Sequence, residues 1–218
     1  MRARKIPPGR RVPTCRFYSD INGRLIDCES PLERDFYQTL EAEHKIIQHY
    51  QEQPFPVPND IKGRGKPLFP DCLVTYKLNA RKKPLLVEVK SEKDLRDPEK
   101  APDIKRKIKI LRAYAVSHGM NFKVVLDTDI RGPRLDNLKF LYQYSRPRQF
   151  TDKYRTPILR GIKAGKEMTV NQILDALAGD RQERAYILPV IWHLLWIKEL
   201  KADLNELLTN GTLLRVKK

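Results

Sequence analysis

Two charged residues stand at the end of a strongly apolar segment, Leu85-Leu-Val-Glu88-Val-Lys90. The apolar run before Glu88 predicts a buried β-strand. Because side chains alternate along a strand, Glu88 and Lys90 should point to one face and Val89 to the other. Charged groups at the end of a buried strand are costly unless they are paired or bind a metal ion. The segment therefore predicts a core strand that ends in a polar site.

Neighbouring patterns indicate what surrounds this strand. Ser30 is a good helix N-cap and Pro31 suits the first helical position, and apolar residues follow at helical spacing. The further segments, in chain order, are β-like residues 44–57, strands at 68–76 and 84–90, a periodic helix at 102–118, a strand at 122–126 and a helix at 135–144. A polar stretch at residues 79–83 could close a hairpin between two of the strands. The order is αβββαβ, which is typical of an α/β fold.

The chain changes character after Arg146-Pro-Arg-Gln. Beyond it, Thr169 with Gln172 and Asp180 with Glu183 have the spacing of capping boxes, so each pair predicts the start of a helix. Residues 201–204 and 212–216 could form two short strands. We therefore expect a basic arm at residues 1–14, a first domain at 15–150 and a winged-helix-like helical domain at 151–218.

The charge balance favours a polyanion as partner. Lysine and arginine number 43 against 27 acidic residues, which gives a formal net charge of +16. Such an excess suits contacts with nucleic-acid phosphates. The three cysteines lie far apart, which argues against a zinc site or a disulfide framework. The N-terminus lacks the apolar segment of a signal peptide, so we expect a cytoplasmic, nucleoid-associated protein that does not contact membranes.

The acidic residues near the strand ends suggest a metal-dependent reaction on phosphodiesters. Asp71 opens one predicted strand and Glu88 lies in the next, and a hairpin would bring them to one face. Clustered carboxylates hold Mg²⁺, which activates water and neutralises phosphate charge, while Lys90 could orient the water or stabilise developing charge. The alternative is a surface hairpin with an ordinary Glu–Lys cross-strand pair.

Other candidates also have a structural alternative. Glu33 could reach the site from the first helix, but Ser30-x-x-Glu33 is also a capping box. His193 stands in an apolar helix and is expected to be a core histidine. Four basic residues of the 102–118 helix could contact DNA or could form a solvated face: Lys105, Arg106, Lys109 and Arg112.

Three strings together resemble the TnsA endonucleases of heteromeric bacterial transposons. They are Glu29-Ser-Pro-Leu-Glu33-Arg-Asp-Phe-Tyr, Phe69-Pro-Asp71-Cys-Leu-Val-Thr-Tyr and Leu85-Leu-Val-Glu88-Val-Lys90-Ser. The tail from His193 to Leu208 resembles the C-terminal domain of that family. The resemblance implies a restriction-endonuclease-like fold of the PD-(D/E)xK class, with catalytic Glu33, Asp71, Glu88 and Lys90.

The resemblance also implies a cofactor and partners. One or two Mg²⁺, for which Mn²⁺ could substitute, would be held by Glu33, Asp71, Glu88 and the Val89 carbonyl. The enzyme would cut the 5′ strands at transposon ends, beside a TnsB-type transposase and a TnsC-type ATPase regulator. The transposons that carry such endonucleases include CRISPR-associated ones. Two alternatives remain at this stage: a repair or restriction endonuclease of the same class, and a non-catalytic winged-helix DNA-binding protein.

Overall fold

The computed structural model describes residues 15–59, 65–162 and 167–217. The predicted basic arm at residues 1–14 lies outside the described residues. The chain divides into two compact units between Arg131 and Gly132. This division comes earlier than the predicted boundary near residue 150, because α5 (Pro133–Tyr142) packs against α8 (Arg181–Trp196) of the second unit.

The first unit has a mixed α/β fold. Its helices and strands are β1 (Cys15–Ser19), β2 (Arg24–Cys28), α1 (Pro31–Glu41), β3 (Ile47–Glu52), β4 (Cys72–Tyr76), the 3-10 helix η1 (Leu78–Ala80), β5 (Leu85–Lys90), α2 (Glu92–Arg96), α3 (Ala101–Ser117), β6 (Asn121–Leu126) and α4 (Asp127–Ile130). The predicted αβββαβ order is formed by α1, β3, β4, β5, α3 and β6. The expected restriction-endonuclease-like core is confirmed.

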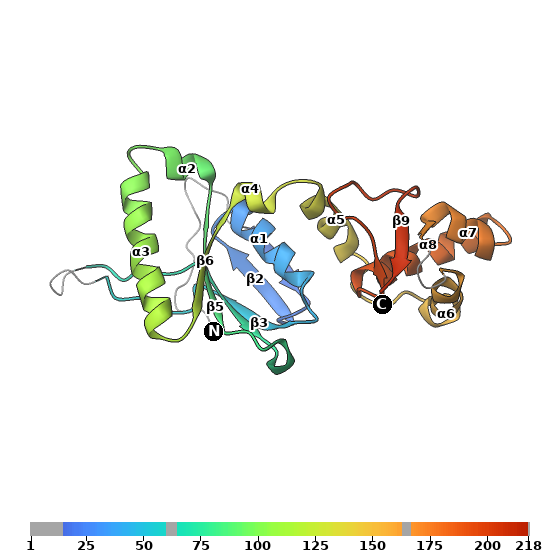
Figure 1. The fold of residues 1–218 in the computed structure, drawn as a ribbon, viewed down its shortest axis with the longest axis horizontal. Coiled ribbons are helices and arrows are strands. Elements are labelled where there is room, and N and C mark those ends of the chain that lie inside the picture. Colours follow the sequence, from blue (N-terminus) through green and yellow to red (C-terminus); the bar gives the residue numbers. More distant parts are fainter. Residues whose placement is uncertain (1–14, 60–64, 163–166, 218) are drawn as a thin grey trace. The chain divides into compact units, whose positions relative to one another are not determined.

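A four-stranded sheet in the order β3-β4-β5-β6 forms the centre of this unit. Strands β3, β4 and β5 are antiparallel neighbours, whereas β5 and β6 are parallel. A parallel pair needs a crossover connection, and here α2 and α3 provide it. Figure 1 shows α3 and α1 on opposite sides of the sheet. The sheet is thus covered on both faces, which explains why Leu86 and Val87 of β5 are fully buried.

The N-terminal hairpin β1–β2 was not predicted from the sequence. The two strands pair antiparallel from Cys15 opposite Cys28 to Ser19 opposite Arg24. Gly23, in the turn between them, has a φ of 63°, a conformation that favours glycine. Helix α1 packs against this hairpin as well as against β5.

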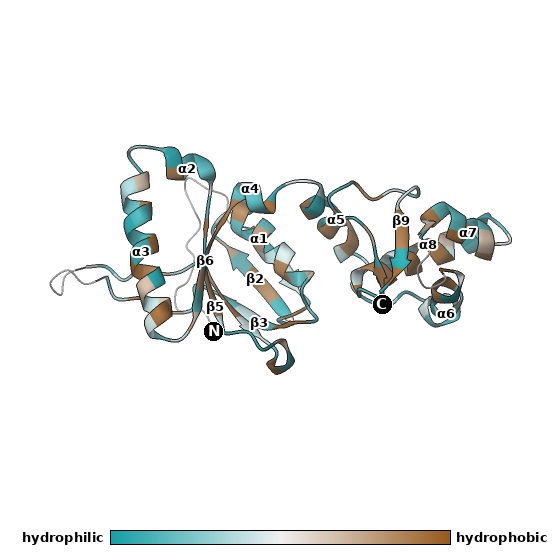
Figure 2. Ribbon diagram, in the orientation of Figure 1, coloured by the Kyte–Doolittle hydropathy of each residue, from teal (hydrophilic) through white to brown (hydrophobic). Residues whose placement is uncertain are grey.

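Helix α3 carries an apolar side toward the sheet and a basic side toward solvent. Leu111 and Ala115 are 0% exposed, and α3 packs against β6. Figure 2 shows hydrophilic and hydrophobic residues alternating around this helix. The observed bounds differ by one residue at each end from the predicted helix at 102–118.

The second unit combines helices with a small sheet. Its elements are α5, α6 (Thr151–Gly161), β7 (Met168–Thr169), α7 (Val170–Leu177), α8, β8 (Leu200–Lys201) and β9 (Leu213–Val216). The sheet has the order β7-β9-β8 and its neighbours are antiparallel. Both predicted capping residues, Thr169 and Asp180, accept a hydrogen bond from the backbone three residues on. The winged-helix interpretation stays a prediction.

The core of the second unit is built around α8, which packs against α5, α6 and α7. His193 is 3% exposed and its Nδ1 lies 2.8 Å from the Tyr144 carbonyl oxygen, so it is a core histidine. The Asn137 amide donates to the carbonyls of Leu204 and Glu206 and thereby fixes the loop between β8 and β9. None of the helices within the described residues could serve as a membrane span.

Candidate active site

The register of β4 and β5 brings two carboxylates together. The strands share three ladder pairs, Val74 with Leu85, Leu73 with Leu86 and Cys72 with Val87. One step beyond the last pair, the same register sets Asp71 opposite Glu88. Directly opposed residues of antiparallel strands point to the same face of a sheet. The two side chains therefore lie together at the end of the hairpin ladder, and both contact the same ammonium groups.

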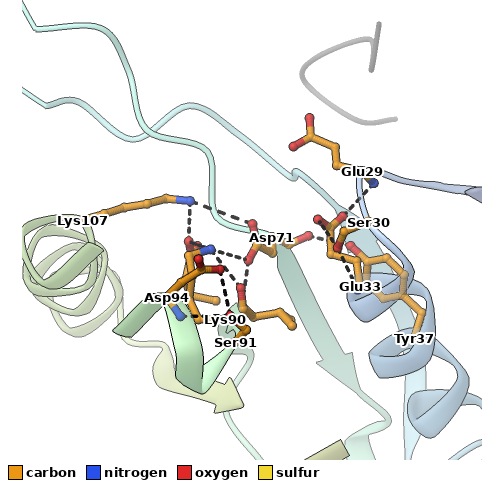
Figure 3. Close-up of polar contacts among 11 residues, drawn as sticks. Glu29, Ser30, Glu33, Tyr37, Asp71, Lys90, Ser91, Asp94 and Lys107 are labelled. Atoms are coloured by element: carbon orange, nitrogen blue, oxygen red, sulfur yellow. Dashed lines mark hydrogen bonds and ion pairs between the residues drawn. The ribbon is translucent and has the colours of Figure 1, made fainter. Parts of the chain in front are cut away.

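Asp71 is fixed by contacts to three parts of the chain. Its Oδ2 accepts a hydrogen bond from the Val89 backbone N–H at 2.6 Å. Its carbonyl oxygen accepts from the Tyr37 hydroxyl at 2.8 Å and from the Gln53 backbone N–H at 3.2 Å. Figure 3 shows Asp71 between Lys107 on one side and Glu33 on the other. The carboxylate is thus held in place before any ligand binds.

Glu88 is a completely buried acid, with 0% of its surface exposed. Its Oε1 lies 2.7 Å from the Lys90 Nζ and 2.5 Å from the Lys107 Nζ. Within the described ranges, neither carboxylate oxygen has a hydrogen bond of regular geometry, so these contacts act chiefly through charge. Burial raises the pKa of Glu88, the negative charge of Asp71 raises it further, and the two lysines oppose this effect.

The Lys90 ammonium contacts three oxygen donors that are expected to hold a metal ion, those of Asp71, Glu88 and the Val89 carbonyl. Its Nζ lies 2.7 Å from Glu88 Oε1 and 3.5 Å from Asp71 Oδ2, and it donates to the Val89 carbonyl at 2.9 Å. Burial alone would lower the pKa of Lys90, but the charges of Asp71 and Glu88 outweigh it and raise that pKa above the usual value. The side chain is therefore a cation at neutral pH.

Glu33 both caps α1 and lies near the other acids. Its Oε2 accepts from the Glu29 backbone N–H at 3.0 Å and its Oε1 from the Ser30 hydroxyl at 3.2 Å, while Ser30 Oγ accepts from the Glu33 N–H. Burial and then the negative charge of Asp71 raise the pKa of Glu33 to about 7. The capping role is thus present, and so is electrostatic contact with the candidate site.

Lys107 is the site residue that the sequence prediction missed. It extends from α3 toward Asp71 (Figure 3), with its Nζ 3.9 Å from Asp71 Oδ1 and 2.5 Å from Glu88 Oε1. The signal was its spacing, since Lys107 comes three residues after Ile104 and four before the buried Leu111. That spacing puts a lysine on the side of the helix that packs against the sheet.

The four basic residues predicted to contact DNA are all exposed on α3: Lys105, Arg106, Lys109 and Arg112. The guanidinium of Arg112 lies 5.8 Å from the centre of the Phe122 ring, in a cation–π contact. The four side chains do not belong to the carboxylate cluster. They form a cationic surface on the helix that supplies Lys107.

A pocket of about 650 Å³ opens beside the cluster. Its lining includes Glu33, Val89 and Lys90 of the site together with the acidic side chains Asp94 and Asp127. Ions and water can therefore reach the side of the site that holds Glu33 and the Val89 carbonyl.

The oxygen donors of this site are of the kind that a hard divalent cation prefers. Asp71, Glu88 and the Val89 carbonyl offer only oxygen, as Mg²⁺ prefers, and they already converge on one ammonium group, that of Lys90. Within the described residues, however, no three His, Cys, Asp or Glu side chains are arranged to hold a metal ion together. Glu33 is turned toward its own N-cap, and it would have to leave those bonds to join the two other acids.

Comparison with protein-family models shows to which family the chain belongs. A model described as the TnsA-like endonuclease N terminal matches residues 44–127, and one described as the TnsA endonuclease C terminal matches residues 129–204. The chain belongs to the TnsA endonuclease family. It is thus a transposon-associated nuclease, as the resemblance predicted. No curated protein matches the chain.

The matched residues divide the TnsA chain where its structure does. The two matches meet at residues 127–129, close to the division between Arg131 and Gly132. The N-terminal match includes Asp71, Glu88, Lys90 and Lys107 and begins after Glu33. The place of Glu33 in the site accordingly depends on its geometry and on the resemblance of its local sequence.

Proposed function

We propose that this TnsA-family protein is a Mg²⁺-dependent endonuclease that cuts the 5′ strands at transposon ends, the strands not joined to the target. The observation that carries the proposal is the convergence of Asp71, Glu88 and Lys90 at the end of one hairpin. Asp71, Glu88 and the Val89 carbonyl offer a divalent ion only oxygen donors, in a partly buried site where the low dielectric strengthens charge interactions.

In this proposal the chain's own residues hold and orient the reactants. Asp71, Glu88 and the Val89 carbonyl hold the ion, and Glu33 completes the set from α1. A bound Mg²⁺ lowers the pKa of water and neutralises charge on the phosphate. Lys90 orients the attacking water for in-line attack and stabilises the developing charge. The products are a 3′-hydroxyl and a 5′-phosphate.

The remaining parts of the chain provide DNA and protein contacts. The exposed cations of α3 contact phosphates of the duplex near the site. The second unit, with its helices and three-stranded sheet, acts as a winged-helix-like module that contacts a TnsC-type ATPase regulator. A TnsB-type transposase cuts and joins the 3′ ends and brings the nuclease to its substrate. The protein acts in the cytoplasm, at the nucleoid.

One experiment tests strand choice, metal and site together. The protein is incubated in Mg²⁺ with an end-labelled transposon-end duplex, with and without a TnsB-type transposase, and the nicked strand is mapped. We expect 5′-strand cuts that require both Mg²⁺ and the transposase. Asp71→Ala should abolish cutting and keep DNA binding, whereas Asp152→Ala, an exposed acid in α6, should cut normally. Full activity of Asp71→Ala would refute the site, and robust site-specific cutting without transposase would refute the transposon role.

A further inference from the structure

The ammonium of Lys107 balances the negative charge of the carboxylate cluster that Lys90 alone would leave. Asp71 and Glu88 carry two formal negative charges, and the two lysines carry two positive ones. Lys107 is only 24% exposed in its side chain and contacts both carboxylates. Taking an ammonium this far out of water is unfavourable unless it is paired. Its position is therefore set by the carboxylates rather than by solvent, in contrast to the exposed basic residues on the same helix.

A divalent ion and both lysines cannot share these oxygens. An ion bound to Asp71 and Glu88 would stand within a few ångströms of each ammonium, where like charges repel strongly in a partly buried site. One ammonium has to leave. Lys90 belongs to β5, whose backbone is paired with β6, so its ammonium stays next to the site after it yields these oxygens to the ion. Lys107 projects from a different element on a flexible four-carbon stem, and its contacts within the described residues are to the two carboxylates.

From this geometry we infer that Lys107 is a built-in counter-cation that competes with the divalent metal for Asp71 and Glu88 and so sets the metal affinity of the free protein. The inference rests on the proposed function, because it takes a metal ion to be the competitor. Metal uptake requires the Lys107 side chain to swing out of the cluster. The free protein therefore binds metal weakly, which restrains a nuclease that should cut only in its assembly.

The Lys107 side chain can move while the helix that carries it stays in place. Leu111 is 0% exposed and anchors α3 on the sheet, while α3 packs against both β6 and α2. The helix therefore has no need to move when the ammonium leaves. The two carboxylates are also fixed. Asp71 accepts a hydrogen bond from the Val89 N–H, and Glu88 belongs to β5, a central strand of the sheet.

Metal titration without DNA tests the inference. Mn²⁺ binding to the full chain is measured by calorimetry for wild type, Lys107→Met, Lys107→Arg and the matched control Lys83→Met, which removes an exposed lysine before the far end of β5. We expect Lys107→Met to bind Mn²⁺ about tenfold more tightly, which corresponds to about 1.4 kcal/mol. Lys107→Arg keeps the charge and should stay within about threefold of wild type, as should Lys83→Met. Asp71→Asn, made in both wild type and Lys107→Met, should remove the binding.

The outcomes separate this inference from the proposed function. Equal or weaker Mn²⁺ binding by Lys107→Met, with Asp71-dependent binding in wild type, overturns the role of Lys107 and leaves the metal site standing. Absence of Asp71-dependent binding in every variant overturns both. Thermal melting followed by circular dichroism gives a second measurement, in which Mn²⁺ should raise the Tm of Lys107→Met more than that of wild type. Tight Mn²⁺ binding by Lys107→Arg would also contradict the inference, because the charge is still present.

Discussion

Replacement of Glu33 by glutamine should make the stability of the first unit less sensitive to pH. Burial and the charge of Asp71 raise the pKa of Glu33 from 4.5 to about 7. Folding thus favours the protonated acid, and this contribution is complete below pH 4.5 and lost as the pH rises through 7. Each pKa unit corresponds to about 1.4 kcal/mol, so ionised Glu33 costs on the order of 3 kcal/mol above pH 7. Glutamine stays neutral throughout.

The measurement is urea unfolding in EDTA between pH 4 and pH 8. The difference in unfolding free energy, Glu33→Gln minus wild type, should rise by roughly 3 kcal/mol over this range. Both tryptophans, Trp192 and Trp196, belong to the second unit, so their fluorescence serves as an internal control that should not change. Far-UV circular dichroism follows both units, so a change that it shows and the tryptophan fluorescence does not show reports on the first unit. Because the charge of Asp71 contributes, the difference should shrink in an Asp71→Asn background.

Parallel stability curves for the two proteins from pH 4 to pH 8 would refute this reasoning. They would mean that Glu33 ionises in the folded protein as it does in water, and that its carboxylate gains as much from the Glu29 N–H and the Ser30 hydroxyl as it loses by burial. A difference that persisted in full after Asp71→Asn would refute a narrower point, the electrostatic contact between Glu33 and the site.

Three further changes test the fold and the DNA surface. Ser30→Ala removes the cap of α1 and should lower the unfolding free energy by about 1 kcal/mol; an unchanged urea midpoint would contradict the capping role. Leu111→Ala empties a fully buried position on α3 and should cost about 2–5 kcal/mol; a loss below 1 kcal/mol, measured by circular dichroism, would mean that α3 is loosely packed. Lys105→Gln with Lys109→Gln should weaken DNA binding in fluorescence anisotropy and lower its salt dependence; identical salt slopes would exclude phosphate contacts by these two lysines.

The core of the first unit could be predicted because its segments are strongly patterned. β5 is apolar before its charged end, and α3 repeats apolar residues at helical spacing, so local sequence and tertiary burial agree. The hairpin β1–β2 escaped prediction because its exposed positions carry large side chains such as Tyr18 and Leu25, which blur the alternation. The early domain division also escaped, since the partner of α5 is α8, far along the chain.

The candidate site was predictable where the sheet alone determines it. Glu88 and Lys90 belong to β5 and Asp71 directly precedes the neighbouring β4, so spacing was enough to bring them together. Lys107 was missed because only the packing of α3 shows which carboxylate its ammonium meets. For Glu33 the sequence left two alternatives, a cap and a site residue. The structure shows the capping bonds together with electrostatic contact to Asp71, because one turn of α1 serves both.

Pairing between β4 and β5 determines which changes of length the chain can tolerate. A single residue inserted within Cys72–Tyr76 would turn Asp71 to the opposite face, because strand side chains alternate with a period of two. Residues 77–84 lie outside the ladder, where extra loop length costs little free energy. Relatives of this nuclease should therefore vary in the length of that turn, while the spacing from the aspartate to the end of its strand should stay constant.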